Sequence, residues 1–222
     1  MAPSVNNYSD IDVSAISFND PRMLDNGSKS IYFNHKKTAL YLQTPVSRAP
    51  FGINDWEGEK FSINISIADK GFLEKIQELD TRIIDEAYAK SQSWFKQKFA
   101  SRDVLAELYT SPIHWSKDKV TGEINTNYEP TFKFNVPYKD KEFKCEGYTK
   151  NVATGEVKPL AISKETIHKG ANIQAILQCS GIWIAGKKFG CTFRLSQLLK
   201  LDDDSAPRKI TGYAFIEDSD EE

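Results

Sequence analysis

The densest combination of aromatic and cationic side chains in the sequence is GIWIAGKKFGCTFRLSQLLKL, residues 181–201. Side chains alternate across a β-strand, so Trp183 points outward if Ile182 and Ile184 point into a core. The residues that would accompany this ring are Lys187, Lys188, Phe189 and Arg194. Unstacked bases lie on aromatic faces while Lys and Arg neutralise phosphates, so this combination suits a single-stranded nucleic acid.

Two weaker patches have the same composition. One is residues 131–144, which carry Lys133 between Phe132 and Phe134. Because Phe132 and Phe134 share one face of a strand, we expect both in the core rather than against a base. The residues of the second patch are Arg48 and Trp56, with Lys36 and Lys37 from an earlier turn.

No constellation of catalytic residues is present. The sequence has no phosphate-binding glycine loop, no nucleophile elbow and no zinc-binding helix motif. Its three histidines, His35, His114 and His168, are isolated from one another and from ligand-spaced Cys or Asp. We therefore expect a non-enzymatic protein with no metal and no cofactor.

The pattern of apolar residues predicts a mainly β protein. Residues 31–33 and 39–42 predict a hairpin with a cationic turn, and residues 61–67 and 131–136 alternate strictly, as strands with one buried face do. Residues 44–59 are rich in Pro, Gly, Asn and Asp and predict a loop. Further β-like runs are 141–146, 172–179, 182–185 and 189–195.

One long helix interrupts these strands. Apolar residues recur every three or four positions from Phe72 to Trp94, which predicts an amphipathic helix of about seven turns. A second, shorter helix is expected over residues 102–109 behind a Ser101 cap, and Pro112 stops it. Trp94 is expected in the core or an interface.

Composition indicates a soluble intracellular protein. The 222 residues, 40% of them hydrophobic, are enough for a core. The three cysteines, Cys145, Cys179 and Cys191, are scattered and indicate reduced thiols. The first residues lack the charged and apolar regions of a signal peptide, and no run approaches a membrane span.

The charge is divided unevenly along the chain. Residues 201–222 hold eight carboxylates against Arg208 and Lys209, so they carry −6, and by difference from the total of −2 the first 200 residues carry +4. A basic body with an acidic tail suggests an anionic partner. The tail could equally serve only solubility, since its composition predicts disorder.

The order of these features resembles that of a known group of viral proteins. The late segment runs from Lys169-Gly170 through Gly186 and Gly190 to Phe193-Arg194-Leu195, and an acidic run ends the chain. Together with the β-rich body and its inserted helix, it is similar to the single-stranded DNA-binding proteins of podovirus replication systems and of nucleocytoplasmic large DNA viruses. Residues 42–55, LQTPVSRAPFGIND, also resemble the loop before the first long strand of the large-virus proteins.

This resemblance implies a five-stranded OB-fold barrel that binds single-stranded DNA without sequence preference in replication, recombination or repair. On this chain the groove residues would be Trp183, Lys187, Lys188, Phe189 and Arg194, with Arg48, Trp56, Lys36 and Lys37 as additions. The long helix is larger than a minimal OB-fold carries and suggests a homodimer contact. If the protein is viral, its compartment is the cytoplasm or nucleus of an infected host cell.

The resemblance also implies a role for the tail, which would contact a polymerase or helicase-primase and compete with DNA for the groove. Two aromatic residues would stand in for bases and five carboxylates for phosphates: Tyr213, Phe215, Glu217, Asp218, Asp220, Glu221 and Glu222. The predicted organisation is an N-terminal extension or edge strand over 1–29, an OB-fold-like domain over 30–200 with a helical insertion at about 71–110, and a disordered tail over 201–222.

A second hypothesis assigns the protein to a different class of function. In it the protein is a non-catalytic interaction or virion-structural module whose acidic tail binds a basic partner. RNA in place of DNA also stays open, since nothing in the sequence reads a 2′-hydroxyl.

Overall fold

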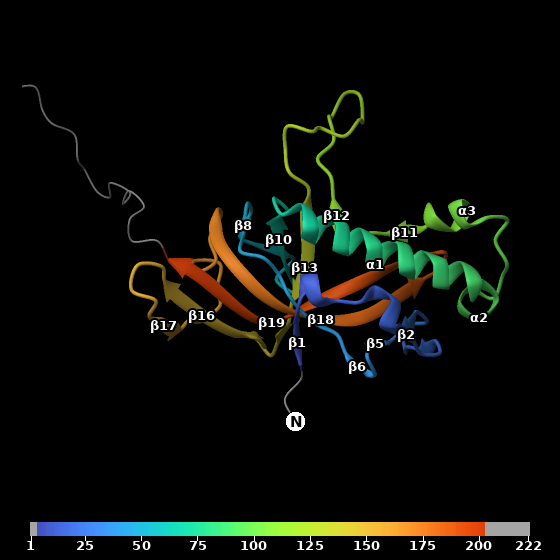
Figure 1. Ribbon diagram of the computed structural model, residues 1–222, viewed down its shortest axis with the longest axis horizontal. Helices are drawn as coiled ribbons and strands as arrows, with labels where there is room; N and C mark the ends of the chain where they lie inside the picture. The colour runs from blue at the N-terminus through green and yellow to red at the C-terminus, as the bar shows by residue number, and fades with distance from the viewer. Residues whose placement is uncertain (1–3, 203–222) are drawn as a thin grey trace, which may run out of the picture.

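Two strands of 15 residues form the spine of the protein in the computed structural model, which describes residues 4–202 (Figure 1). They are β18 (Ala171–Ala185) and β19 (Lys188–Asp202), joined as an antiparallel hairpin through Gly186 and Lys187. Two irregularities, at Ile176/Leu177 and at Cys179/Gly181, shift the register of the pair. The sequence predicted two separate strands over 172–179 and 182–185. They are one strand, because Gly181 lies in a bulge rather than a turn.

Short strands from the first third of the chain pair along β18. β4 (Lys29–Ile31), β7 (Tyr41–Gln43) and β8 (Ser47–Ala49) each pair antiparallel with a different part of it. Beyond them, β3 (Arg22–Met23) pairs with β4, and β1 (Val5–Asn7) pairs parallel with β7. The stretch predicted as a loop thus contributes β8, because its backbone pairs with β18.

The other side of β19 has three successive partners: β11 (Tyr109–Thr110), β13 (Thr131–Val136) and β16 (Glu146–Asn151). β13 leads on to β10 (Lys60–Ser66) and then β9 (Ile53–Trp56), and it also pairs with β12 (Ile113–His114). β16 pairs with β17 (Val157–Pro159) at one end of the molecule (Figure 1). The predicted one-sided strands at 61–67 and 131–136 are confirmed, with Phe132 and Phe134 in the core.

These strands make an open 14-stranded sheet whose main path runs β1-β7-β18-β19-β13-β10-β9. The protein is mainly β, as expected, but the expectation of a closed five-stranded barrel is wrong, since the pairing leaves β1 and β9 as separate ends. The physical reason is the length of β18 and β19. Each is longer than a strand of a small barrel and pairs with different short strands along its length.

Helix α1 (Lys70–Ala89) covers the apolar face of the sheet (Figure 1). Asp69 caps it by accepting a hydrogen bond from the backbone N–H of Phe72 at 2.9 Å, and the Phe72 ring lies 5.4 Å from that of Phe132. The expected seven-turn helix is too long, because the chain breaks at Lys90 before α2 (Ser91–Phe95). Trp94, in α2, is fully buried, as expected for a core residue.

A third helix, α3 (Arg102–Ala106), begins at the expected cap, where the Ser101 hydroxyl accepts from the Val104 N–H at 3.3 Å. It ends earlier than predicted because Tyr109 belongs to β11. None of the helices within residues 4–202 combines the length and apolarity of a membrane span.

The N-terminal segment is more than an edge strand. It forms β1, the short 3₁₀ helices η1 (Tyr8–Asp10) and η2 (Val13–Ala15), and β2 (Ile16–Phe18). Its residues Ile11, Val13 and Ile16 are buried, so this segment is part of the core. β2 belongs to a small second sheet with β5 (Phe33–His35) and β6 (Thr38–Ala39). The cationic turn at Lys36 and Lys37 is as predicted, but its hairpin is shorter, because Ile31 and residues 41–43 pair with β18 instead.

Two remaining features complete the fold. β14 (Tyr138–Lys139) and β15 (Glu142–Phe143) form a separate hairpin. Cys179 and Cys191 are buried with their Sγ atoms 3.3 Å apart, and Cys145 is half-buried.

Candidate nucleic-acid interface

A row of polar side chains crosses the side of the sheet away from α1. The strand registers pair Asn54 with Ser62, Ser62 with Asn135, Asn135 with Arg194, and Arg194 with Gln178. Paired residues on neighbouring strands point to the same face, so these five side chains share one surface. With about 4.8 Å between strands, the row from β9 to β18 is roughly 19 Å long.

The same alternation places further residues on this surface, while the alternate residues of β10, β13 and the first part of β19 are buried on the other face. We call this surface the polar face. It comprises Asn54, Trp56, Lys60, Ser62, Asn64, Lys133, Asn135, Gln178, Trp183, Lys188, Thr192 and Arg194.

The polar face contains two adjoining hollows. The first, of about 680 Å³, lies over β9 and β10 and has Phe51 and Trp56 in its wall. The second, of about 200 Å³, lies where β13 and β19 diverge and has Trp183 in its wall. Lys133 and Asn135 line both hollows, so the two lie next to each other. We call the pair the depression; it has an aromatic residue at each outer end.

The aromatic residues at the two ends differ in how far the protein covers their rings. Trp56 is 69% exposed and Phe51 is 57% exposed, so both rings are open to a ligand. Trp183 is half-buried and pairs with Gly190, where an added Cβ would lie 2.9 Å from Cζ2 of the indole. Glycine at 190 therefore allows the Trp183 ring to lie against the strand.

Three cations of the polar face are not neutralised by any residue that the structure describes. Lys60, Lys133 and Arg194 are exposed, and none forms an ion pair with any residue between 4 and 202. Two cations on α1 are paired instead: Lys75 lies 2.7 Å from Glu78, and Arg82 lies 2.8 Å from Glu86. The unpaired charges on the polar face are free to neutralise phosphates.

The carboxylate nearest to this depression is already occupied. Asp55, which lines the first hollow, accepts a hydrogen bond from Lys164 Nζ at 2.5 Å and another from the Gly58 N–H at 2.7 Å. The bond from Lys164, followed by that from Gly58, lowers the pKa of Asp55. Its charge is thus directed at Lys164 rather than at the polar face.

A buried carboxylate on α1 fixes the wall of the second hollow. Asp80 accepts hydrogen bonds from Tyr109 Oη at 2.6 Å and from Ser111 Oγ at 2.5 Å. These residues belong to the segment that bridges β19 and β13, through the pairs of β11 and β12. Burial raises the pKa of Asp80 to about 6, although the two hydrogen bonds lower it.

His114 lines the second hollow beside Lys133. Partial burial, and then the positive charge of Lys133, lowers the pKa of His114 below its ordinary value. The imidazole is therefore neutral at pH 7 and offers both a donor and an acceptor to a ligand.

The raised pKa of Asp80 makes stability depend on pH. A carboxyl whose pKa is about 6 in the folded state and about 3.9 unfolded stabilises the fold below pH 4, and that contribution is lost as pH rises through 6. The Asp80→Asn variant lacks this titrating group. As pH rises from 4 to 7, the difference between its free energy of unfolding and that of the wild type should therefore change by up to about 3 kcal/mol in favour of the variant. Urea denaturation at several pH values measures this difference, and curves that stay parallel would contradict it.

The structure brings together only part of the predicted site. Trp183, Arg194 and Lys188 are on the polar face at one end, and Trp56 is on it at the other. Arg48, on β8, pairs with Asn172 further along β18, and Lys187 is in the β18–β19 turn.

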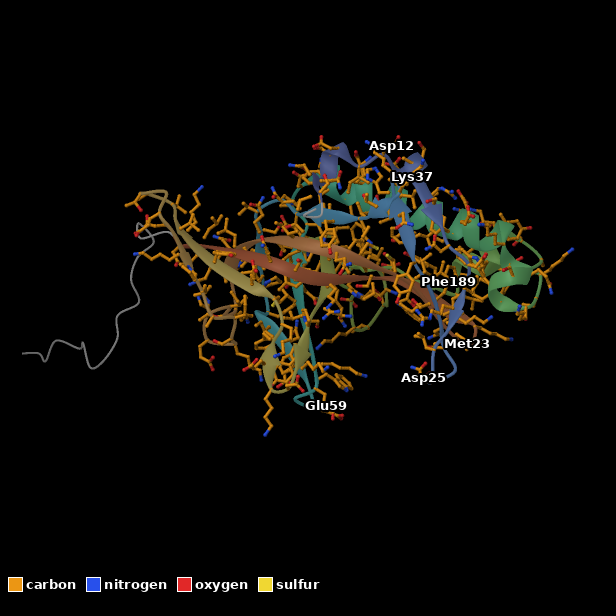
Figure 2. All side chains as sticks on the ribbon, turned by 90° about the horizontal axis from the view of Figure 1, so that it is seen from below. Asp12, Met23, Asp25, Lys37, Glu59 and Phe189 are labelled. Atoms are coloured by element: carbon orange, nitrogen blue, oxygen red, sulfur yellow. The ribbon has the colours of Figure 1, made fainter. Side chains whose placement is uncertain are left out.

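Arg48 and Lys187 are thus not among the residues of the polar face, and three more predicted residues lie elsewhere in the fold. Phe189 is fully buried, because its ring packs 5.2 Å from Phe95 and 5.1 Å from Tyr109, so its placement in the groove is corrected to the core. Lys36 and Lys37 are in the β5–β6 turn, and Figure 2 shows Lys37 and Glu59, the latter in the β9–β10 turn, on opposite sides of the β18–β19 hairpin.

The predicted tail residues lie outside the described residues: Tyr213, Phe215, Glu217, Asp218, Asp220, Glu221 and Glu222. Leu201 and Asp202, assigned to the tail by composition, are the last residues of β19. Within residues 4–202, no group of three or more His, Cys, Asp and Glu side chains is placed to hold a metal ion.

The residues at the centre of the polar face are largely missing from the predicted site. Asn64, Asn135 and Gln178 were not singled out, and Lys133 appeared only in a secondary patch. The signal was present, since strict alternation in residues 61–67 and 131–136 assigns Asn64, Lys133 and Asn135 to the face opposite the core.

Comparison with protein families gives a match over residues 53–217 to a model described as "Family of unknown function (DUF5871)". The chain belongs to this family. Among curated proteins the sequence has no match. The DUF5871 match includes β9, β10, β13, β18 and β19, which carry the whole polar face.

Two solved structures are similar in arrangement to this DUF5871 protein. Both are of the single-stranded DNA-binding protein from bacteriophage Enc34. The C-terminally truncated form is 11% identical, with a TM-score of 0.43, and the alignment covers 85% of this chain and 97% of that one. The other is 10% identical, with the same TM-score, and covers 82% and 88%. Neither likeness is close enough to transfer a function.

Proposed function

We propose that the polar face binds single-stranded DNA without sequence preference and without catalysis. The observation that carries this proposal is the depression, in which two neighbouring hollows share Lys133 and Asn135 and have Trp56 and Trp183 in their outer walls. In this arrangement bases stack on the rings at the two ends, and the unpaired cations between them neutralise phosphates.

The shape of the depression favours a single strand over a duplex. Stacking on Trp56 or Trp183 requires a base whose own face is free, and a duplex hides its base faces. The amide side chains between the rings, Asn135 and Gln178 among them, can donate to or accept from any base edge. They therefore favour contact with many sequences rather than one.

We further propose a setting for this activity, in keeping with the resemblance to viral single-stranded DNA-binding proteins. The protein would serve DNA replication, recombination or repair in an infected cell, as a homodimer. Its acidic residues from 217 to 222 would compete with DNA for the polar face and, when displaced, recruit a polymerase or helicase-primase.

The test is fluorescence anisotropy with labelled oligo-dT, the matching duplex and oligo-rU over a series of salt concentrations. We expect tighter binding to oligo-dT than to duplex, and an affinity that falls linearly on a log–log plot against salt, because bound phosphates release counterions. Equal affinity for the duplex, or no dependence on salt, would contradict the proposal. Tighter binding to oligo-rU would assign the face to RNA, and no binding at all would favour the interaction module.

A further inference from the structure

A third hollow, apolar in character, lies at the end of the β18–β19 hairpin away from Trp183. It has a volume of about 400 Å³ and lies between β16, β17, β18 and β19. Its apolar lining includes Tyr148, Val157, Ile176 and Leu199. The strand registers bring these residues together, since Tyr148 pairs with Leu199 and Ile176 pairs with Gln197.

This apolar surface is only partly covered by the described chain. Val157 is 54% exposed, and Ile176 and Leu199 are half-buried although they lie in central strands of the sheet. An apolar hollow left open beside a polar rim is typical of a surface that receives another chain segment. The question is which segment it receives.

The chain that follows β19 starts at the edge of the hollow. β19 ends at Asp202, three residues after Leu199, and Leu201 pairs with Lys150 in the lining. Ten residues, 203–212, then precede the stretch Tyr213-Ala-Phe-Ile216, the longest apolar run after Asp202. Ten extended residues span at most about 33 Å, which is ample for a return to the hollow. The family match continues to residue 217, so it includes this apolar run.

The charges also match. Lys150 lines the hollow and has no ion pair with any residue in the described part of the chain, whereas its neighbours Lys158 and Lys200 are paired with Glu156 and Asp202. Glu217 and Asp218 directly follow the apolar run. An apolar segment seated in the hollow would therefore bring a carboxylate to the one cation of the lining.

We propose that residues 213–216 dock in this hollow of their own chain, with Glu217 or Asp218 beside Lys150. Ile176 and Gln178 are two residues apart on the same side of β18, so the hollow adjoins the polar face. Docking thus anchors the acidic residues 217–222 at the end of the polar face. Regulation of DNA binding by these acidic residues rests on the proposed function. The docking of residues 213–216 does not.

The test is limited chymotrypsin digestion of the full chain without DNA, with mass spectrometry to follow cleavage after Tyr213 and Phe215. Val157→Asp removes apolar surface from the hollow at an exposed position, and Val120→Asp makes the same change at a residue that is 94% exposed in the loop of residues 115–130. We expect cleavage to be roughly tenfold slower in the wild type than in Val157→Asp, because cleavage follows the population of undocked segment. Val120→Asp should match the wild type.

Three results would overturn the proposal. Equal cleavage rates in the wild type and Val157→Asp would show that the hollow does not hold the segment. Faster cleavage in the double variant Lys133→Ala with Arg194→Ala, but not in Val157→Asp, would place residues 213–216 on the polar face instead. Protection that increases with protein concentration would make the occupant a second copy. Since no DNA is present, protection can be seen even if the polar face binds no nucleic acid.

Discussion

Replacement of Lys133 and Arg194 together with alanine is expected to weaken binding to oligo-dT by roughly tenfold to a hundredfold at moderate salt. Both side chains are exposed on the polar face and lack an ion pair within residues 4–202. Each would neutralise a phosphate, so the slope of the log–log salt plot should fall by about 1.4. Fluorescence anisotropy over a salt series measures both quantities.

The matched control is Lys36→Ala with Lys37→Ala, which removes the same net charge on the other side of the β18–β19 hairpin (Figure 2). It should leave the affinity within about twofold of the wild-type value, because those cations lie far from the bound strand. A similar loss in both double variants would mean that total charge, and not the polar face, determines binding. Exposed, unpaired side chains contribute little to stability, so urea denaturation should show both variants folded.

Loss of either terminal ring is expected to have an effect of similar size through a different interaction. Trp56→Ala and Trp183→Ala should each lower oligo-dT affinity by roughly 5-fold to 150-fold, since a stacked base contributes about 1–3 kcal/mol. The salt slope should stay unchanged, because no charge is removed. Affinity and slope from the same titrations therefore distinguish stacking from phosphate neutralisation.

Tyr128→Ala provides the control for exposed aromatic area, since Tyr128 is 64% exposed in the loop of residues 115–130. It should bind as the wild type does. Trp183 also covers Gly190, and Trp183→Phe keeps an aromatic ring there, so it should bind more tightly than Trp183→Ala. If Trp183→Phe binds as weakly as Trp183→Ala while Trp56→Ala binds normally, bases do not stack at the ends of the depression.

Much of the polar face follows from alternation within single strands. Residues 61–67 and 131–136 each bury every second side chain, so Asn64 and Lys133 had to face away from the core. The same rule places Phe189 in the core, because it continues the buried series of Cys191 and Phe193. Phe189 was expected in the groove, but the turn is limited to Gly186 and Lys187, so Phe189 lies within β19 on its buried side.

Other features depend on contacts that no local pattern contains. The pairing of Asn135 with Arg194 joins strands that are far apart in the sequence, and it alone places Lys133 near Arg194. β8 and β9 could not be recognised among the Pro, Gly and Asn residues of the stretch 44–59, because tertiary pairing outweighed local propensity there. The break of the helix at Lys90 is likewise absent from the apolar pattern, which continues to the buried Trp94 in α2.

The position of the spine in the chain has a consequence for how the protein folds. β18 and β19 are the last of the described strands. β4, β7 and β8 all pair with β18, which lies more than a hundred residues after them in the sequence. During synthesis these early strands lack their β18 partner, so their backbone edges stay unpaired until residues 171–202 have been made. Folding should therefore be slow for a chain of this size and most prone to aggregation before the last hairpin forms.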